Sequence, residues 1–96
     1  MKVHKIVTSG YRKGNYDDIV RNLRGWVRGI EQEPNTIKVT AHIEEANFNI
    51  WTGVQTWKTT ITTWKDLDYA YSKTRNPNYN PKDYRWKLEQ EGVFDE

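Results

Sequence analysis

The sequence predicts a small α+β domain in which an antiparallel sheet of three to four strands packs on one main amphipathic helix. Three observations predict this fold class. Apolar residues recur at helical spacing over about 16–29, and from Thr36 onward they alternate with polar residues. Threonines then crowd residues 56–63, a composition that favours a strand. Because the chain has 96 residues, we expect a single domain over 1–96.

The opening segment is expected to form a strand and then the main helix. Val3, Ile6 and Val7 indicate the strand. Asn15 suits the helix N-cap, because its side chain can accept a hydrogen bond from a free N–H of the first turn. The helix is expected to end at Gly29, since glycine is common just beyond the last helical turn. Its apolar arc consists of Tyr16, Ile19, Val20, Leu23, Trp26, Val27 and Ile30.

The middle of the chain is expected to supply the remaining strands. The alternation over 36–50 slips by one residue at Glu44-Glu45, which indicates a bulge or a turn. A hairpin turn is expected at Thr52-Gly53. The segment 54–63 fits helical spacing as well as a strand, and its β-branched residues favour the strand.

The last third is expected to be mainly helical and irregular. A capping pattern at Thr63 predicts a short second helix over about 64–73. Asn and Pro residues predict irregular structure over 75–80. Asn80 and Pro81 can open a third helix. The same segment also alternates, so a terminal strand is the alternative.

Composition excludes several classes of protein. The chain has no cysteine, so neither a disulfide framework nor a thiolate zinc site can form. No apolar run approaches the ~20 residues that cross a bilayer. These features indicate a cytoplasmic protein with no membrane partner. Its small size and abundant Asn, Thr and Tyr are typical of proteins encoded by viruses or mobile elements, which would place it in a host cytosol.

No catalytic, metal or cofactor site is predicted. His4 and His42 are the only histidines, and neither is tied by spacing to a serine nucleophile. A metal site would need carboxylates, of which Glu44, Glu45 and Asp68 have no evident structural role. We therefore expect a protein that is not an enzyme and uses no cofactor.

Positive charge is concentrated in residues 1–30, whereas the end 89–96 is acidic and expected to be flexible. A glycine-containing turn over 9–14 would offer free N–H groups to a phosphate or another anion. Three arginines of the helix fall within about 60° of one another on the helical wheel. Such a row of arginines can lie along the phosphate backbone of a nucleic acid. The structural alternative is that these bases only solvate the surface and complement the helix dipole. The predicted anion-binding residues are Tyr11, Arg12, Lys13, Arg21, Arg24 and Arg28.

Five aromatic residues have no expected place in the core: Tyr11, Trp51, Tyr79, Tyr84 and Trp86. Of these, Trp51, Tyr84 and Trp86 are the predicted contacts with a protein or with bases. Exposed aromatic rings stack on nucleobases and also form hot spots for protein binding. We therefore expect a binding module that recognises an anionic partner, either a nucleic acid or a nucleotide-like ligand. The alternative is an inhibitor, encoded by a virus or mobile element, that binds a host protein through these aromatic side chains. A homodimer formed by edge strands is a further expectation.

Overall fold

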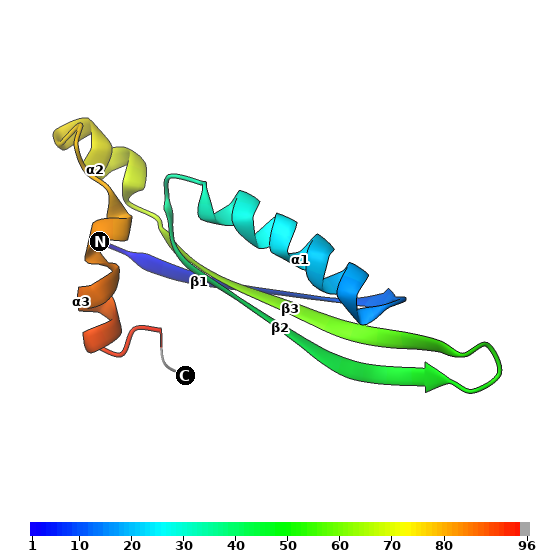
Figure 1. The fold of residues 1–96 in the computed structure, drawn as a ribbon. Helices are drawn as coiled ribbons and strands as arrows, with labels where there is room; N and C mark the ends of the chain where they lie inside the picture. Colours follow the sequence, from blue (N-terminus) through cyan, green and yellow to red (C-terminus); the bar gives the residue numbers. More distant parts are fainter. Residues whose placement is uncertain (95–96) are drawn as a thin grey trace.

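The computed structural model describes residues 1–94, which form the predicted α+β fold (Figure 1). In chain order the elements are β1 (Val3–Lys13), α1 (Tyr16–Glu31), β2 (Thr36–Asn49), β3 (Val54–Asp66), α2 (Tyr69–Arg75), the 3-10 helix η1 (Pro81–Tyr84) and α3 (Arg85–Gln90). β3 lies in the centre of the three-stranded sheet and pairs antiparallel with both β1 and β2. β1 and β2 are therefore the edge strands, and α1 connects them across one face.

β1 is longer than the sequence predicts, because it includes the expected glycine turn. Pairing with β3 runs from Val3 opposite Asp66 to Lys13 opposite Thr56. Only Gly14, at φ 134°, supplies the turn into α1. The turn predicted over 9–14 is therefore wrong, since this segment extends along β3 instead of curving around an anion.

α1 begins at the predicted cap but ends later than predicted. Asn15 Oδ1 accepts a hydrogen bond from the Asp17 N–H at 2.8 Å, which confirms the N-cap. The helix continues past Gly29 to Glu31. Glycine does not end this helix because a helical glycine costs only about 1 kcal/mol, and Ile30 remains half-buried against the sheet.

β2 and β3 form a long hairpin that projects beyond α1 (Figure 1). A register shift between Glu45 and Asn47 interrupts the pairing, so the irregularity predicted at Glu44-Glu45 is a bulge within a continuing strand. Gly53 adopts φ 70° at the tip, in agreement with the predicted turn. The strand prediction for 54–63 is confirmed.

The second helix starts later than predicted, whereas the last helical segment begins at the predicted cap, Asn80. Thr63 and Trp64 belong to β3, so the second helix begins at Tyr69 and the predicted cap at Thr63 is wrong. Pairing with β1 and β2 holds these residues in the strand. Asn80 Oδ1 accepts a hydrogen bond from the Lys82 N–H at 3.1 Å. The last segment is therefore helical, and the alternative of a terminal strand is excluded.

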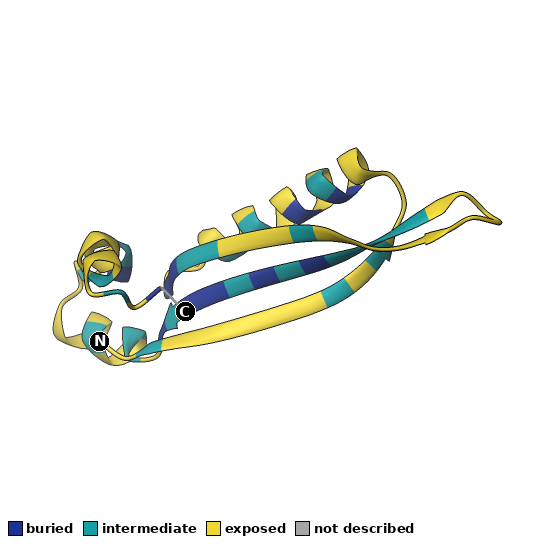
Figure 2. Cartoon of the chain, turned by 90° about the horizontal axis from the view of Figure 1, so that it is seen from below, coloured by how far each residue is buried: buried dark blue, intermediate teal, exposed yellow. Residues whose placement is uncertain are grey.

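The hydrophobic core is small and is divided between the two faces of the sheet. On one face, α1 buries Ile19 and Leu23 on the side that faces β2 and β3. On the other face, Trp64 packs against Ile37 and Phe94 at one end of the sheet. Figure 2 shows that exposed residues cover long stretches of the edge strands and the projecting hairpin.

The molecule is elongated. Its principal extents are 59 × 24 × 17 Å and its radius of gyration is 16.8 Å, whereas a compact domain of this length has about 12.5 Å. The accessible surface is 6956 Å², compared with roughly 5,800 Å² for a compact monomer of this mass. The protein therefore exposes about 1,150 Å² more surface than a compact monomer would.

Candidate functional site

The sheet has one face that α1 does not cover, which we call the open face. Arg12 and Trp57 mark the covered face: the Arg12 guanidinium lies 4.0 Å from the ring centroid of Trp26, and Trp57 contacts Tyr16. Because side chains alternate along a strand, the residues next to Arg12 and Trp57 point the other way. The open face comprises Lys5, Val7, Ser9, Tyr11 and Lys13 of β1, Lys38, Thr40, His42 and Glu44 of β2, and Thr56, Lys58, Thr60, Thr62 and Trp64 of β3.

The strand register sets the geometry of the open face. Lys58, on the central strand, lies opposite Tyr11 on one side and Glu44 on the other. Tyr11 is 69% exposed. Four lysines and one glutamate give the open face a net charge of +3 (4 − 1) when His42 is neutral. It is a basic surface with hydroxyl groups between the charges and an aromatic ring near one end.

The other end of the open face is partly occupied by the chain itself. Lys5 and Lys38 flank Trp64, with their Nζ atoms 5.7 and 5.9 Å from its ring centroid. Lys38 Nζ also lies 3.6 Å from Glu89 of α3. The opposite end of the open face, which carries Tyr11, Lys13 and Lys58, is therefore the part best able to receive a ligand.

α1 brings the three predicted arginines together on its outer surface. They line one shallow concavity of about 580 Å³: Arg21, Arg24 and Arg28. The same helix carries Asp17, Asp18 and Glu31, so its charges sum to zero (3 − 3). Arg21 lies 3.8 Å from Asp18. This surface is rich in guanidinium groups but is electrically balanced.

The six residues predicted to bind an anion do not form one surface. Tyr11 and Lys13 lie on the open face, whereas Arg12 is stacked on Trp26 on the covered face. The three arginines lie on the outer side of α1. Sequence reasoning missed Lys58, whose only signal is its position between threonines in a strand, because its neighbours come from two distant segments.

The three predicted aromatic contacts also lie apart. Trp51 is 91% exposed at the tip of the hairpin, near the exposed Phe48 and Ile50. Tyr84 and Trp86 lie in η1 and α3, at the opposite end of the molecule (Figure 1). These side chains therefore do not form one patch.

The buried polar groups serve the fold. Asp66 is 1% exposed, and it accepts hydrogen bonds from the Asp68 N–H at 2.9 Å and the Tyr79 hydroxyl at 2.5 Å. Burial and this hydrogen bond raise the pKa of Tyr79 well above its ordinary value. Lys82 Nζ donates to the carbonyl groups of Glu33 and Thr36, and burial lowers the pKa of Lys82. These groups attach the C-terminal helices to the sheet.

The carboxylates considered for a metal site are not brought together. Glu44 and Glu45 are neighbours in β2 and point to opposite faces of the sheet, and Asp68 follows the far end of β3. Over residues 1–94, no three His, Cys, Asp or Glu side chains are grouped as a metal ion would require. The same part of the chain holds no helix that is long and apolar enough to span a membrane.

No protein-family model, curated protein or solved structure matches this chain.

Proposed function

We propose that the protein is a non-catalytic binding module that holds single-stranded nucleic acid on its open face. The observation that supports this function is the grouping of Lys13 and Lys58 around the exposed ring of Tyr11. Ammonium groups neutralise backbone phosphates, and an exposed aromatic ring stacks on a base. The hydroxyl groups of Ser9 and Thr60, which lie 3.4 Å apart, can donate to phosphate or sugar oxygens.

The shape of the open face favours a single strand over a duplex. Three strands spaced by about 4.8 Å, with a rise of about 3.3 Å per residue, make a shallow platform on which unpaired bases can lie. A duplex is instead read by a helix or a two-stranded ribbon that enters a groove. The projecting hairpin has the shape of a ribbon, but its residues 46–57 carry no positive charge that could neutralise phosphates.

Fluorescence anisotropy with a labelled oligouridine tests this function. If Lys13 and Lys58 each neutralise one phosphate, the logarithm of the affinity falls with the logarithm of the salt concentration with a slope of about −1.4. We expect Tyr11→Ala and the double variant Lys13→Ala/Lys58→Ala to weaken binding at least fivefold each, since stacking on one ring contributes ~1–3 kcal/mol. Lys87→Ala, an exposed lysine of α3, is the matched control.

The arginines of α1 provide the decisive comparison. If Arg21→Ala/Arg24→Ala/Arg28→Ala abolishes oligouridine binding while Lys13→Ala/Lys58→Ala does not, the nucleic acid lies on α1 and the open face is not the site. An affinity that is indifferent to salt would exclude the nucleic-acid function itself.

The hairpin tip supports a second candidate function, docking into a folded protein partner. Residues 46–57 carry no charge, and Phe48, Ile50 and Trp51 are 54%, 77% and 91% exposed. Apolar side chains gathered on a projecting element mark a contact site. The acidic residues at the base of the hairpin favour an apolar pocket with a basic rim.

Substitutions separate the two functions. Trp51→Ala is expected to leave the affinity for oligouridine unchanged and to abolish binding of a protein partner that contacts the hairpin tip. Tyr11→Ala is expected to do the reverse. If both substitutions impair oligouridine binding equally, the tip belongs to the nucleic-acid site and the second candidate is wrong.

A further inference from the structure

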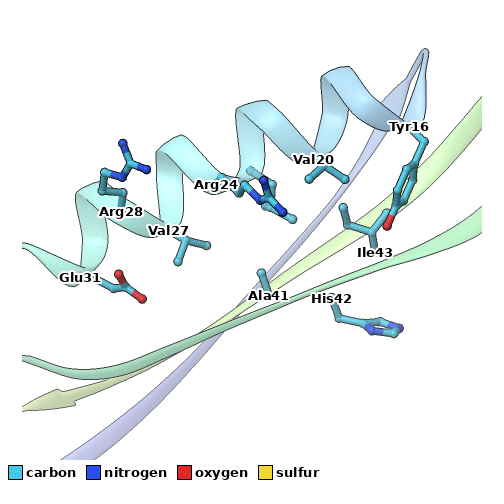
Figure 3. Close-up of a pocket in the computed structure, with 10 residues that line it drawn as sticks. Tyr16, Val20, Arg24, Val27, Arg28, Glu31, Ala41, His42 and Ile43 are labelled. Carbon is cyan, nitrogen blue, oxygen red and sulfur yellow. The ribbon is translucent and has the colours of Figure 1, made fainter.

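A groove of about 540 Å³ runs between α1 and β2 and opens at the edge of the sheet (Figure 3). Ala41 and Ile43 point toward α1, and His42 points away. Val20 and Val27 of α1 add to the apolar lining, and the charged side chains of Arg24, Arg28 and Glu31 also line the groove. β2 pairs with β3 on one side only, so its outer edge presents N–H and C=O groups that another strand can pair with.

The two edges of the sheet differ in how their charges are arranged. β1 carries Lys5 toward one end and Arg12 and Lys13 at the other. Antiparallel pairing with a second β1 would set these bases against one another, which protects this edge from pairing with itself. β2 has opposite charges at the two ends of its regular segment, Lys38 at one end and Glu44 at the other.

One antiparallel register of β2 against a second β2 is self-complementary. With Ala41 opposite Ala41 of the second copy, Lys38 stands opposite Glu44 on the open-face side, and Val39 stands opposite Ile43 on the groove side.

Other registers are less favourable. A shift of one residue would place the two copies of α1 on opposite faces of the joined sheet. A shift of two residues in either direction loses both contacts between Lys38 and Glu44, because Lys38 then stands opposite Ala46 or His42. The alternation of residues in β2 thus favours one register.

We infer that β2 pairs antiparallel with β2 of a second copy about Ala41, which joins the two three-stranded sheets into one. Both copies of α1 then lie on the same side, and the two grooves between α1 and β2 meet along the seam. The elongated chain exposes about 1,150 Å² more surface than a compact monomer of this mass, part of it along β2 and part along the projecting hairpin. This dimer does not depend on the function proposed above, although it would join two open faces into one longer surface.

Cysteine substitution tests the register, because the natural chain has no cysteine. Ala41→Cys is expected to cross-link under mild oxidation to a species of twice the 11.5 kDa chain mass, since the two side chains meet at the two-fold axis. Ser9→Cys, an exposed residue of the other edge strand, is the matched control and should remain uncross-linked. Equal cross-linking of both variants, or none with Ala41→Cys, would overturn the register.

Sedimentation equilibrium of charge variants tests the dimer without a covalent bond. Glu44→Lys places like charges opposite each other at two symmetric positions and is expected to weaken dimerisation about tenfold. Adding Lys38→Glu should restore the wild-type affinity. Lys38 also lies 3.6 Å from Glu89 in its own chain, a contact that the double variant does not restore. Rescue therefore reports on the contact between copies.

Glu45→Lys is the matched control, since it makes the same change of charge on the other face of β2 and is expected to weaken dimerisation much less. Circular dichroism of each variant verifies that the chain is folded. A wild-type protein that stays monomeric up to millimolar concentration would overturn the inference. Equal weakening by Glu44→Lys and Glu45→Lys would do the same.

Discussion

Tyr79 connects the segment after α2 to the end of β3 through one hydrogen bond. Its hydroxyl donates to the buried Asp66 at 2.5 Å, while its ring contacts Tyr69 and Tyr84. A buried carboxylate that loses a donor keeps its desolvation cost, whereas the ring contacts do not depend on the hydroxyl. The polar contact and the ring contacts can therefore be separated by one substitution.

Tyr79→Phe is expected to lower the free energy of unfolding by about 1–3 kcal/mol, because it leaves Asp66 with one donor fewer in a buried site. Urea denaturation measures the change. Tyr84→Phe is the matched control, since Tyr84 is 44% exposed and its ring lies against the same Tyr79. An equal loss in both variants would show that the hydrogen bond from Tyr79 to Asp66 contributes no more than the hydroxyl of the exposed Tyr84 does.

The raised pKa of Tyr79 predicts how stability depends on pH. The folded state keeps the phenolic proton that the unfolded chain releases above the ordinary pKa of 10.0. The free energy of unfolding should therefore fall as the pH rises above about 10. Lys82, whose pKa is lowered, contributes a slope of the opposite sign. The measurement is the difference between wild type and Tyr79→Phe, which isolates Tyr79 and should grow smaller as the pH rises.

At the scale of elements, α1 carries two glycines that its backbone does not require. A Cβ atom at Gly25 or Gly29 would meet no atom within 4 Å. Gly25→Ala and Gly29→Ala are each expected to raise the free energy of unfolding by about 0.5–1 kcal/mol, because alanine loses less conformational entropy in a helix. Thermal unfolding measures the change.

Gly53→Ala is the control for that pair, with the opposite expected sign. Gly53 sits at φ 70° in the hairpin turn, a conformation that strains any residue with a Cβ atom. If Gly25→Ala and Gly29→Ala also destabilise the protein, then the helix needs glycine at these positions for a reason other than space.

The elements that the sequence predicts best are those whose signals are local. The apolar spacing of α1 and the cap at Asn15 depend on residues within a few turns, and the hairpin turn depends on Thr52-Gly53. The end of β3 at Asp66 depends on pairing with Val3, at the far end of the chain. A local capping pattern at Thr63 therefore predicted a helix where long-range pairing maintains a strand.

The same difference between local signals and long-range pairing applies to the candidate site. Neighbours in sequence predicted Tyr11 and Lys13 together, and the structure places both on the open face because they are two residues apart in one strand. Arg12, between them, points to the other face. Lys58 joins them only through strand pairing, which no spacing within its own segment reveals.

At the scale of the whole molecule, the fold is a one-sided sheet with an extension. The core lies where α1 covers the sheet and where the C-terminal helices meet Trp64. The hairpin tip contributes none of the buried hydrophobic residues. The sheet that α1 covers should therefore be stable without the tip. The open face, the hairpin tip and the outer edge of β2 can then be tested separately.

Replacement of residues 46–56 by Asn-Gly tests this division. The new turn joins Glu45 to Trp57, which are already paired across the hairpin, and Asn-Gly suits a two-residue hairpin loop. The free energy of unfolding is expected to fall by less than about 2 kcal/mol, since no core side chain is removed, although the Gly14 N–H loses its hydrogen bond to the Gln55 carbonyl. Urea denaturation and sedimentation should show a folded chain that still dimerises through β2 and binds oligouridine through Tyr11 and Lys58. Loss of folding would show that the tip stabilises the sheet, and loss of dimerisation in a folded variant would move the interface from the regular part of β2 to the hairpin.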